Sequence, residues 1–225
     1  MVKAYVVTLL NIPQSVEVAT RCIESGKTFN IDVEIFPAVW KDFAEEELKR
    51  EGLKVKSYDT RYSNPGAVIG NFVSQYRIWK KILELGKPGI VLEHDAVFVA
   101  PIPDLTGQGE IISLGKPSYG SFKSQKIPGV YPLYSKSGYV PGAHGYYVTP
   151  LGAQRLIEKA KIVGAGPCDL FLGTVIPDEG NTPLEVREIW PWPVEAWDSF
   201  TTIQNETGCI AKHNWQKDRK NFKIL

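Results

Sequence analysis

The sequence predicts an α/β fold in which a mixed sheet is flanked by helices. The chain opens with an apolar run, an amphipathic helical segment and a second apolar run, and this β-α-β order indicates a pair of parallel strands. The strongest helical periodicity of the chain then leads directly into another apolar run, Gly89–Val99. The 225 residues contain no internal repeat and no clear linker, so we expect a single domain.

The opening of the chain supplies two strands and two helices. Ala4–Leu10 has the apolar character of a buried strand, and apolar residues lie on one face of a helix expected from about 15 to 25. Ile31–Phe36 is expected to be the second strand. Asp42 then begins a capping-box pattern, D-x-x-E, which predicts a short charged helix that ends at Gly52.

A longer helix is expected after a polar loop over residues 54–66. Apolar residues recur there at helical spacing, and Gly86 ends the pattern. These apolar residues are Ile69, Phe72, Val73, Tyr76, Trp79 and Leu83. Ser74 and Gln75 lie in the middle of the same helix. Because Ser is mildly unfavourable inside a helix, these polar residues either have a specific partner or lie on a solvated face.

The run Gly89–Val99 is interrupted by three polar residues, Glu93, His94 and Asp95. Carboxylates at the end of a buried strand need something that offsets their desolvation. A divalent cation would do so, and ligands of open α/β sheets collect beyond the carboxyl ends of strands. In an alternating strand the side chains of residues 93 and 95 share a face and His94 points away. The alternative is a solvated acidic turn.

The second half of the chain is expected to place short elements around a long loop. Strands are expected at Glu110–Leu114 and Gly145–Val148, with an irregular loop over about 115–142 between them. Loops of this length are often binding loops or lids, and four tyrosines favour a binding surface here. They are Tyr119, Tyr131, Tyr134 and Tyr139. The Gly142–Gly145 turn allows the backbone to approach another segment closely.

The remaining elements end in a polar tail. Thr149 as the N-cap and Pro150 at the first helical position predict a helix with an inward apolar face. A short helix is expected from Asp169 and a strand over Val186–Trp190, and the chain is expected to be irregular from about residue 198.

Composition narrows the class of protein. The formal net charge is +1 and the mean hydropathy is −0.16, which argues against nucleic acid as the main partner. The three widely spaced cysteines, Cys22, Cys168 and Cys209, form no disulfide framework and fit a reducing compartment. We recognise no signal peptide and no run long enough to be a transmembrane segment. A cytoplasmic protein, with peripheral membrane association allowed, is expected.

Several segments together resemble glycosyltransferase family 25, the lipooligosaccharide-biosynthesis and procollagen galactosyltransferase group. Gly70–Trp79 is similar to its helix motif G-C-x-x-S-H-x-x-x-W, and Leu92–Asp95 is similar to its L-E-D-D strand end. Gly142–Leu156 resembles its small-residue turn, strand and G-A-x-x-L helix, and Asp169 falls where the family has an acidic residue. The resemblance covers most of residues 4–172 in the family's order, and Asn11 and Arg21 are compatible with its start.

The resemblance implies a GT-A-like fold, a UDP-sugar donor that is often UDP-galactose, and a divalent metal, Mn²⁺ or Mg²⁺. It also implies inversion of configuration and a setting in cell-envelope polysaccharide assembly, including lipopolysaccharide biosynthesis. The chain departs from the family's motifs at three positions: Asn71 stands for Cys, Gln75 for His, and His94 for the middle acid. The last departure removes one anionic ligand and brings metal affinity, or activity itself, into question.

Candidate metal ligands follow from this context. Asp95, assisted by Glu93, is the expected metal site, because a cation between carboxylates and phosphate oxygens neutralises the leaving diphosphate. His213 lies in a polar stretch of the tail, where GT-A enzymes often supply a late ligand. The alternative for His213 is a solvated side chain.

Asp169 is the first candidate for the general base that an inverting transfer needs to deprotonate the acceptor hydroxyl. The alternative role of Asp169 is an ordinary N-cap of the short helix. Asp198, beside Trp197 and Phe200, is the second candidate, because aromatic faces commonly line sugar sites.

Residues expected near the donor nucleotide or sugar come from several segments of the chain. They are Thr8, Leu9, Asn11, Ser74, Gln75, Glu93 and His144. For Ser74 and Gln75, the alternative is support of the strand end at Glu93. For His144, a plain tight turn is an equally good interpretation.

Taken together, the sequence predicts a metal-dependent hexosyltransferase that moves galactose from a UDP-sugar to a glycan or lipid-linked saccharide acceptor. A first alternative is a catalytically degenerate relative that binds a nucleotide-sugar or a glycan. A second is another nucleotide-using enzyme, such as a nucleotidyltransferase. That class usually carries a Gly-rich phosphate loop after its first strand, and Thr8–Gln14 contains no glycine.

Overall fold

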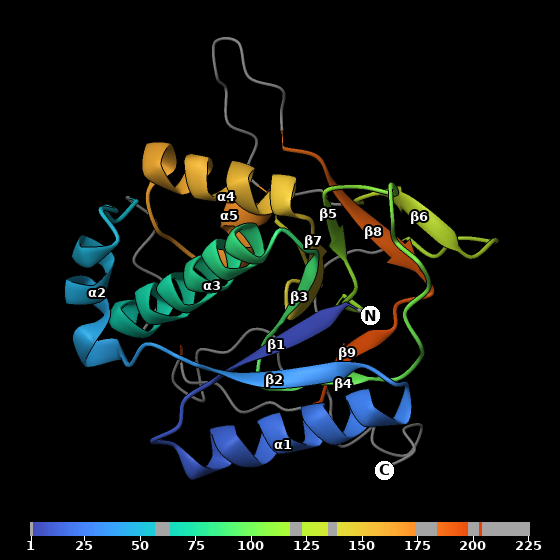
Figure 1. The fold of residues 1–225 in the computed structure, drawn as a ribbon, viewed down its shortest axis with the longest axis horizontal. Helices are drawn as coiled ribbons and strands as arrows, with labels where there is room; N and C mark the ends of the chain where they lie inside the picture. The colour runs from blue at the N-terminus through green and yellow to red at the C-terminus, as the bar shows by residue number, and fades with distance from the viewer. Residues whose placement is uncertain are drawn as a thin grey trace.

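One seven-stranded mixed sheet organises the chain in the computed structural model (Figure 1). The structure describes residues 2–56, 64–117, 123–134, 139–173, 184–197 and 203. The strands are β1 (Lys3–Thr8), β2 (Asp32–Pro37), β3 (Gly89–Leu92), β4 (Ala96–Phe98), β5 (Ile111–Ser113), β6 (Gly129–Pro132), β7 (Gly145–Val148), β8 (Val186–Trp190) and β9 (Val194–Ala196). The helices are α1 (Pro13–Thr28), the 3₁₀ turn η1 (Lys41–Phe43), α2 (Ala44–Arg50), α3 (Pro65–Leu85), α4 (Pro150–Val163) and α5 (Cys168–Gly173).

The strand order of the main sheet is β2-β1-β3-β7-β5-β8-β6. β1 pairs in parallel with both β2 and β3, whereas β7 runs antiparallel to β3 and β5. β8 is parallel to β5, and β6 is antiparallel to β8 at the edge. The predicted α/β class, the mixed sheet and the parallel opening pair are therefore confirmed. β4 and β9 form a separate two-stranded antiparallel sheet.

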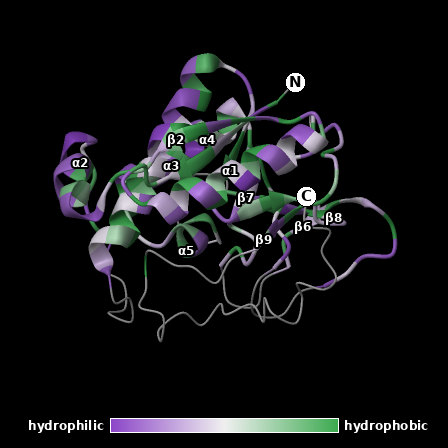
Figure 2. Cartoon of the chain, turned by 90° about the horizontal axis from the view of Figure 1, so that it is seen from below, coloured by the Kyte–Doolittle hydropathy of each residue, from purple (hydrophilic) through white to green (hydrophobic). Residues whose placement is uncertain are grey.

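The sheet is apolar on both faces because helices cover both. Side chains alternate along β1, so that Tyr5 and Val7 join the core under α3, α4 and α5, whereas Ala4 and Val6 join the core over α1. Figure 1 shows α3 and α4 above the sheet and α1 below it. Seen from the α1 side in Figure 2, hydrophilic and hydrophobic stretches alternate along the helices, as expected when each buries one face.

Helix α3 is the largest element packed on the sheet, and its ends follow the rules of helix capping. Asn64 Oδ1 accepts a hydrogen bond from the Ala67 backbone N–H at 3.1 Å, Pro65 occupies the first helical position, and Gly86 ends the helix with φ of 60°. Trp79 is fully buried in this helix and contacts Phe72 and Phe171 through its ring.

Two predicted caps have different outcomes. Thr149 Oγ1 accepts from the Gly152 backbone N–H at 3.0 Å, so the predicted N-cap of α4 is confirmed. The capping box at Asp42 is wrong: η1 precedes α2, and neither start is capped by a side chain. Asp42 Oδ2 instead accepts from the indole N–H of Trp40 at 2.9 Å, a partner that sequence spacing does not reveal.

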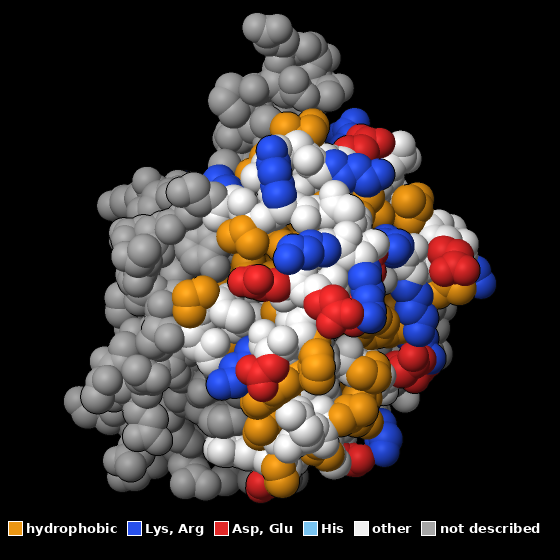
Figure 3. Space-filling model, turned by 90° about the vertical axis from the view of Figure 1, so that its left-hand side faces the viewer, with side chains coloured by type: hydrophobic (Ala, Val, Ile, Leu, Met, Phe, Trp, Pro, Cys, Tyr) orange, Lys and Arg blue, Asp and Glu red, His pale blue; other side chains and the backbone are white. Residues whose placement is uncertain are grey.

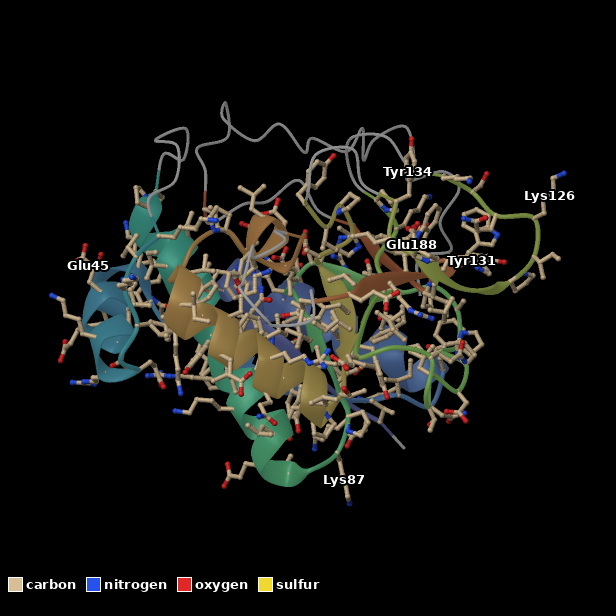
Figure 4. All side chains as sticks on the ribbon, turned by 90° about the horizontal axis from the view of Figure 1, so that it is seen from above. Glu45, Lys87, Lys126, Tyr131, Tyr134 and Glu188 are labelled. Carbon is tan, nitrogen blue, oxygen red and sulfur yellow. The ribbon has the colours of Figure 1, made fainter. Side chains whose placement is uncertain are left out.

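The region over 115–142 is less irregular than predicted. Gly129–Pro132 forms the edge strand β6, in which Tyr131 lies opposite Glu188 of β8. Figure 4 shows Tyr131, Tyr134 and Glu188 close together at this edge, and the Tyr134 backbone N–H donates to the Glu188 carboxylate at 3.1 Å. Tyr119 lies outside the described residues, as does the chain from 198 onward apart from residue 203.

Acidic and basic side chains are intermingled on the surface around α2 (Figure 3). Arg50 pairs with Glu46 and Glu47 of its own helix, and Arg77 of α3 pairs with Glu47 and Glu51. Positive and negative charges therefore balance on this surface, as they nearly do over the whole sequence, whose formal net charge is +1. Among the described residues, no helix is both long and apolar enough to cross a membrane.

Gly115 and Gly142 bring two loop segments into close backbone contact beside the end of β7. A Cβ built on either glycine would overlap the carbonyl oxygen of the other, and one on Gly142 would also lie 2.8 Å from Ser113 Oγ. The expected close approach at the Gly142–Gly145 turn is therefore confirmed. This contact fixes the turn that carries His144.

We expect Gly142→Ala to lower the free energy of unfolding by about 1–3 kcal/mol, since the backbone atoms it would overlap cannot move independently. Each kcal/mol corresponds to a decrease in Tm of about 2–4 °C for a domain of this size. Gly129→Ala is the matched control, because its Cβ would meet only the side chain of Tyr131, whose nearest atom would lie 3.3 Å away. Equal Tm values for Gly142→Ala and the control in thermal unfolding would contradict the expected overlap.

Candidate functional site

The turn that joins β3 to β4 holds the two acidic residues of the E-H-D segment. The Ala96 backbone N–H donates to the Glu93 carbonyl at 3.1 Å, and the Glu93 N–H donates to the His144 carbonyl at 2.9 Å. The Trp197 N–H donates to the Asp95 carbonyl at 3.0 Å. Backbone groups that directly precede β7 and directly follow β9 therefore hold this turn at the carboxyl end of β3.

His94 and Asp95 lie in this turn and not in a strand, so the predicted strand alternation is wrong as the reason for their orientation. The side chains of Glu93 and His94 nevertheless face different helices. Glu93 is hydrogen-bonded by the side chain of Asn71 on α3, whereas His94 Nδ1 lies 2.8 Å from Ser15 Oγ on α1.

Three carboxylates are close enough to interact electrostatically at this edge of the sheet. Burial, followed by the negative charges of Asp95 and Asp169, raises the pKa of Glu93 to about 8, and the hydrogen bond from Asn71 opposes the shift. Burial and then the charges of Glu93 and Asp169 raise the pKa of the Cys168 thiol well above its usual value. The structure thus brings together acidic residues of the β3–β4 turn and α5, which are far apart in the sequence.

Asp169 lies inside the first turn of α5 and does not precede it. Its Oδ1 accepts from the adjacent Leu170 N–H at 2.9 Å, and its carbonyl accepts from Val140 at 2.9 Å. The side chain is half-buried. The fold therefore leaves part of Asp169 accessible beside Glu93.

The end of β1 is linked to the same turn. Ser15 Oγ accepts from the Leu9 backbone N–H at 3.0 Å and contacts His94 Nδ1, so one hydroxyl connects the β1–α1 loop to the E-H-D turn. Thr8 is fully buried and its hydroxyl donates to the Val6 carbonyl, whereas Asn11 is exposed. The expected donor residues Leu9 and Asn11 thus lie in a loop that is tied to the acidic turn.

The positively charged side chain of Arg21, on α1, lies near the acidic turn. The Arg21 guanidinium lies 5.8 Å from the centre of the Trp197 ring, and Trp197 is hydrogen-bonded to Asp95 through its backbone. Burial and the Asp95 charge raise the pKa of the Cys22 thiol, and the Arg21 charge opposes this, so both charges act at the same point. Arg21 was considered in the sequence only for its match to the family's start.

The two polar residues inside α3 have different partners. Ser74 Oγ donates to the Gly70 carbonyl at 2.6 Å and accepts from the Val39 N–H at 2.8 Å, which ties α3 to the segment after β2. Gln75 faces the sheet, where its Oε1 accepts from the Tyr146 hydroxyl at 2.6 Å. Both side chains are fully buried, so the solvated face considered for this helix is excluded.

His144 is buried in the Gly142–Gly145 turn, and its backbone carbonyl accepts the hydrogen bond from the Glu93 N–H. Two predicted residues, Asp198 and His213, lie outside the described residues. Within the part of the chain that the structure describes, no group of three or more His, Cys, Asp and Glu side chains is arranged to hold a metal ion. The sequence does not indicate Asn71 or Tyr146 as site residues. The departure from the family's helix motif at position 71 is the one sequence signal that points to Asn71.

Comparison with known proteins bears on this site. In an alignment over 189 residues that covers 77% of the chain, the sequence is 23% identical to a protein of Anopheles gambiae named "Glycosyltransferase 25 family member". A protein of Aedes aegypti with the same name is 25% identical over 189 residues and 77% of the chain. The chain is similar to glycosyltransferase family 25.

This similarity confirms the resemblance seen in the motifs and extends over 77% of the chain. The aligned part corresponds to 32% and 31% of the two mosquito proteins, so the chain spans about a third of the length of these family 25 relatives. No family model matches the sequence.

We expect Glu93→Gln to change the pH dependence of stability. Because the folded state raises the pKa of Glu93 from 4.5 to about 8, it holds a proton that the unfolded chain has already lost in this range. The free energy of unfolding therefore falls as pH rises through this range, by at most about 1.4 kcal/mol per pH unit from this group. Glu93→Gln removes that part of the decline.

Urea unfolding of metal-free protein between pH 5 and pH 8 measures this difference. Glu45→Gln, on the exposed surface of α2 (Figure 4), is the control and should follow the wild type. A Glu93→Gln curve that runs parallel to the wild-type curve over the whole range would show that Glu93 is not held protonated.

Proposed function

We propose that the chain is a glycosyltransferase domain that transfers a hexose, galactose in the first instance, from a UDP-sugar to a glycan or lipid-linked saccharide. The observation that carries this proposal is the convergence of Glu93, Asp95 and Asp169 at one end of the sheet in a chain similar to family 25. These residues belong to the segments on which the motif resemblance rests.

Glu93 and Asp95 are the residues that would hold a divalent cation, Mn²⁺ or Mg²⁺. The fit rests on the raised pKa of Glu93, to which the charge of Asp95 contributes, because a bound cation would relieve this repulsion. Their carboxylate oxygens are the ligands that hard cations prefer, and diphosphate oxygens and water would complete the coordination. When bound, the cation neutralises the charge of the leaving diphosphate. His213 is a further candidate ligand.

The donor nucleotide is proposed to bind beyond the carboxyl end of β1. Asn11 is exposed there, and the Ser15 hydroxyl holds the Leu9 backbone and the His94 ring in one arrangement. Open α/β sheets bind ligands at this edge, next to the turn that carries the acidic residues. His144, in the neighbouring turn, is proposed to lie on the sugar side.

Asp169 is proposed as the general base of an inverting transfer. Its carboxylate is half-buried and close enough to Glu93 to shift the pKa of that residue, which supports a location near the diphosphate. A base in this position would accept the proton of the acceptor hydroxyl as the sugar–phosphate bond breaks. Asp198 is the second candidate for this role.

Asp95→Asn is expected to remove Mn²⁺-dependent binding of UDP and UDP-galactose, because it deletes a charged ligand without a large change in shape. Calorimetric titration with and without Mn²⁺ should show at least a tenfold weaker Kd, which is a loss of about 1.4 kcal/mol. Asp104→Asn, an exposed aspartate whose carboxylate accepts from the Thr106 N–H, is the control.

The titration also separates the alternatives. Nucleotide binding that needs no metal and survives Asp95→Asn would reduce the acidic turn to a structural feature. Absence of nucleotide binding by the wild-type chain would favour a degenerate relative and refute the proposed donor.

Asp169→Asn is expected to reduce kcat by about 10²–10⁴-fold while the KM for the UDP-sugar changes little, since the amide cannot accept the proton. The assay follows release of UDP in the presence of a saccharide acceptor. An unchanged kcat would exclude Asp169 as the base, and Asp198→Asn would then be tested in the same way.

A further inference from the structure

A chain of hydrogen bonds runs through the core between α3 and β7 and ends at Glu93. The Trp79 indole N–H donates to the Tyr146 hydroxyl at 2.9 Å, and this hydroxyl lies 2.6 Å from Gln75 Oε1. Gln75 Nε2 lies 3.3 Å from Asn71 Oδ1, and the Asn71 side chain is hydrogen-bonded to the Glu93 carboxylate. The links to Tyr146 and to Glu93 join α3 to segments that are distant in the sequence.

The chemistry of the groups determines the direction of every link. An indole N–H can only donate, so the Tyr146 oxygen accepts there and its own proton goes to Gln75 Oε1. Gln75 therefore presents its NH₂ to Asn71 Oδ1, and Asn71 presents its NH₂ to Glu93. The chain is a one-way series of donors that ends on an oxygen of the Glu93 carboxyl group, which accepts the last hydrogen bond.

This arrangement is buried along most of its length. Trp79 and Gln75 are fully buried, and Tyr146 is 1% exposed. If one of these side chains turned around, it would break the hydrogen bond to its neighbour and leave a buried polar group without a partner. Such a group costs free energy of folding, so the observed orientations are favoured. The buried hydrogen bonds of the series therefore hold the Asn71 amide in the orientation that donates to Glu93.

Asn71 and Gln75 are also two of the three positions at which the chain departs from the helix and strand motifs of family 25. They lie four residues apart on α3 and are bonded to each other. The structure thus explains why these two departures belong together: the amide at position 75 needs an acceptor at position 71 to continue the series.

We propose that Gln75 is a positioning residue that acts through Asn71, and that the Trp79–Tyr146–Gln75–Asn71 series orients the Glu93 carboxylate toward the donor site. The effect on nucleotide binding rests on the proposed function. The orientation of Asn71 does not, and it can be measured without any ligand.

The ligand-free test observes the side-chain NH₂ of Asn71 by ¹⁵N–¹H NMR, with the signal assigned by its loss in Asn71→Asp. Glu93→Gln should shift this signal, because the carboxyl oxygen that accepts from Asn71 is replaced by an amide oxygen. Gln75→Met should shift it too, because Asn71 Oδ1 loses its donor. Gln75→His, which can accept from Tyr146 and donate to Asn71, should leave it near the wild-type position.

Two further variants complete this test. Gln154→Met is the matched control, because Gln154 is exposed on α4 and bonds only Glu158 among the described contacts. If the Gln75→Met protein does not fold, Tyr146→Phe takes its place in the test. We expect Tyr146→Phe to shift the Asn71 signal in the same direction as Gln75→Met. An Asn71 signal that is unchanged in both Gln75→Met and Tyr146→Phe overturns the proposal.

The functional test repeats the titration of UDP with Mn²⁺. Gln75→Met and Asn71→Ala are each expected to weaken Kd about fivefold or more, and the double variant should be no weaker than Asn71→Ala alone, since Gln75 acts through Asn71. Independent, multiplying effects would overturn the series. If the wild-type chain binds no nucleotide, the proposed function fails, and the NMR result alone decides the positioning role.

Discussion

Burial of like charges at the end of a central strand is the constraint on which the rest of this structure depends. Glu93 is half-buried and interacts with the carboxylates of Asp95 and Asp169, and the result is a raised pKa. Such an arrangement is unfavourable in isolation and persists only where the surrounding backbone determines it. Here hydrogen bonds to His144 and Trp197 hold the turn from two sides, so the acidic residues stay where the sheet places them.

The neighbouring elements all contribute to this one edge. Helix α1 supplies Ser15 and Arg21, which approach the turn from below the sheet, and α3 supplies Asn71 from above. The close contact of Gly115 with Gly142 sets the position of the loop that carries His144. The proposed donor site is therefore built from several separate segments, and its geometry depends on their packing on both faces of one sheet.

The departures from the family's motifs also become intelligible at this edge. His94 replaces an acid, and its ring bonds Ser15 on the α1 side, away from Asn71 and Glu93. On α3 the two amides bond each other and continue toward Glu93, which is consistent with a coordinated change and not with the loss of single parts.

The sequence by itself determined the class of fold and most of its elements, because periodic apolar patterns and end signals are local properties of the chain. Thr149, Gly86 and the run at Gly89–Val99 show this. It also brought Glu93, Asp95 and Asp169 forward as candidates. Only the tertiary structure decided that these carboxylates interact with one another and that β6 and β9 are strands. Strand pairing and long-range side-chain contacts depend on segments that are distant in sequence, and no local pattern encodes those partners.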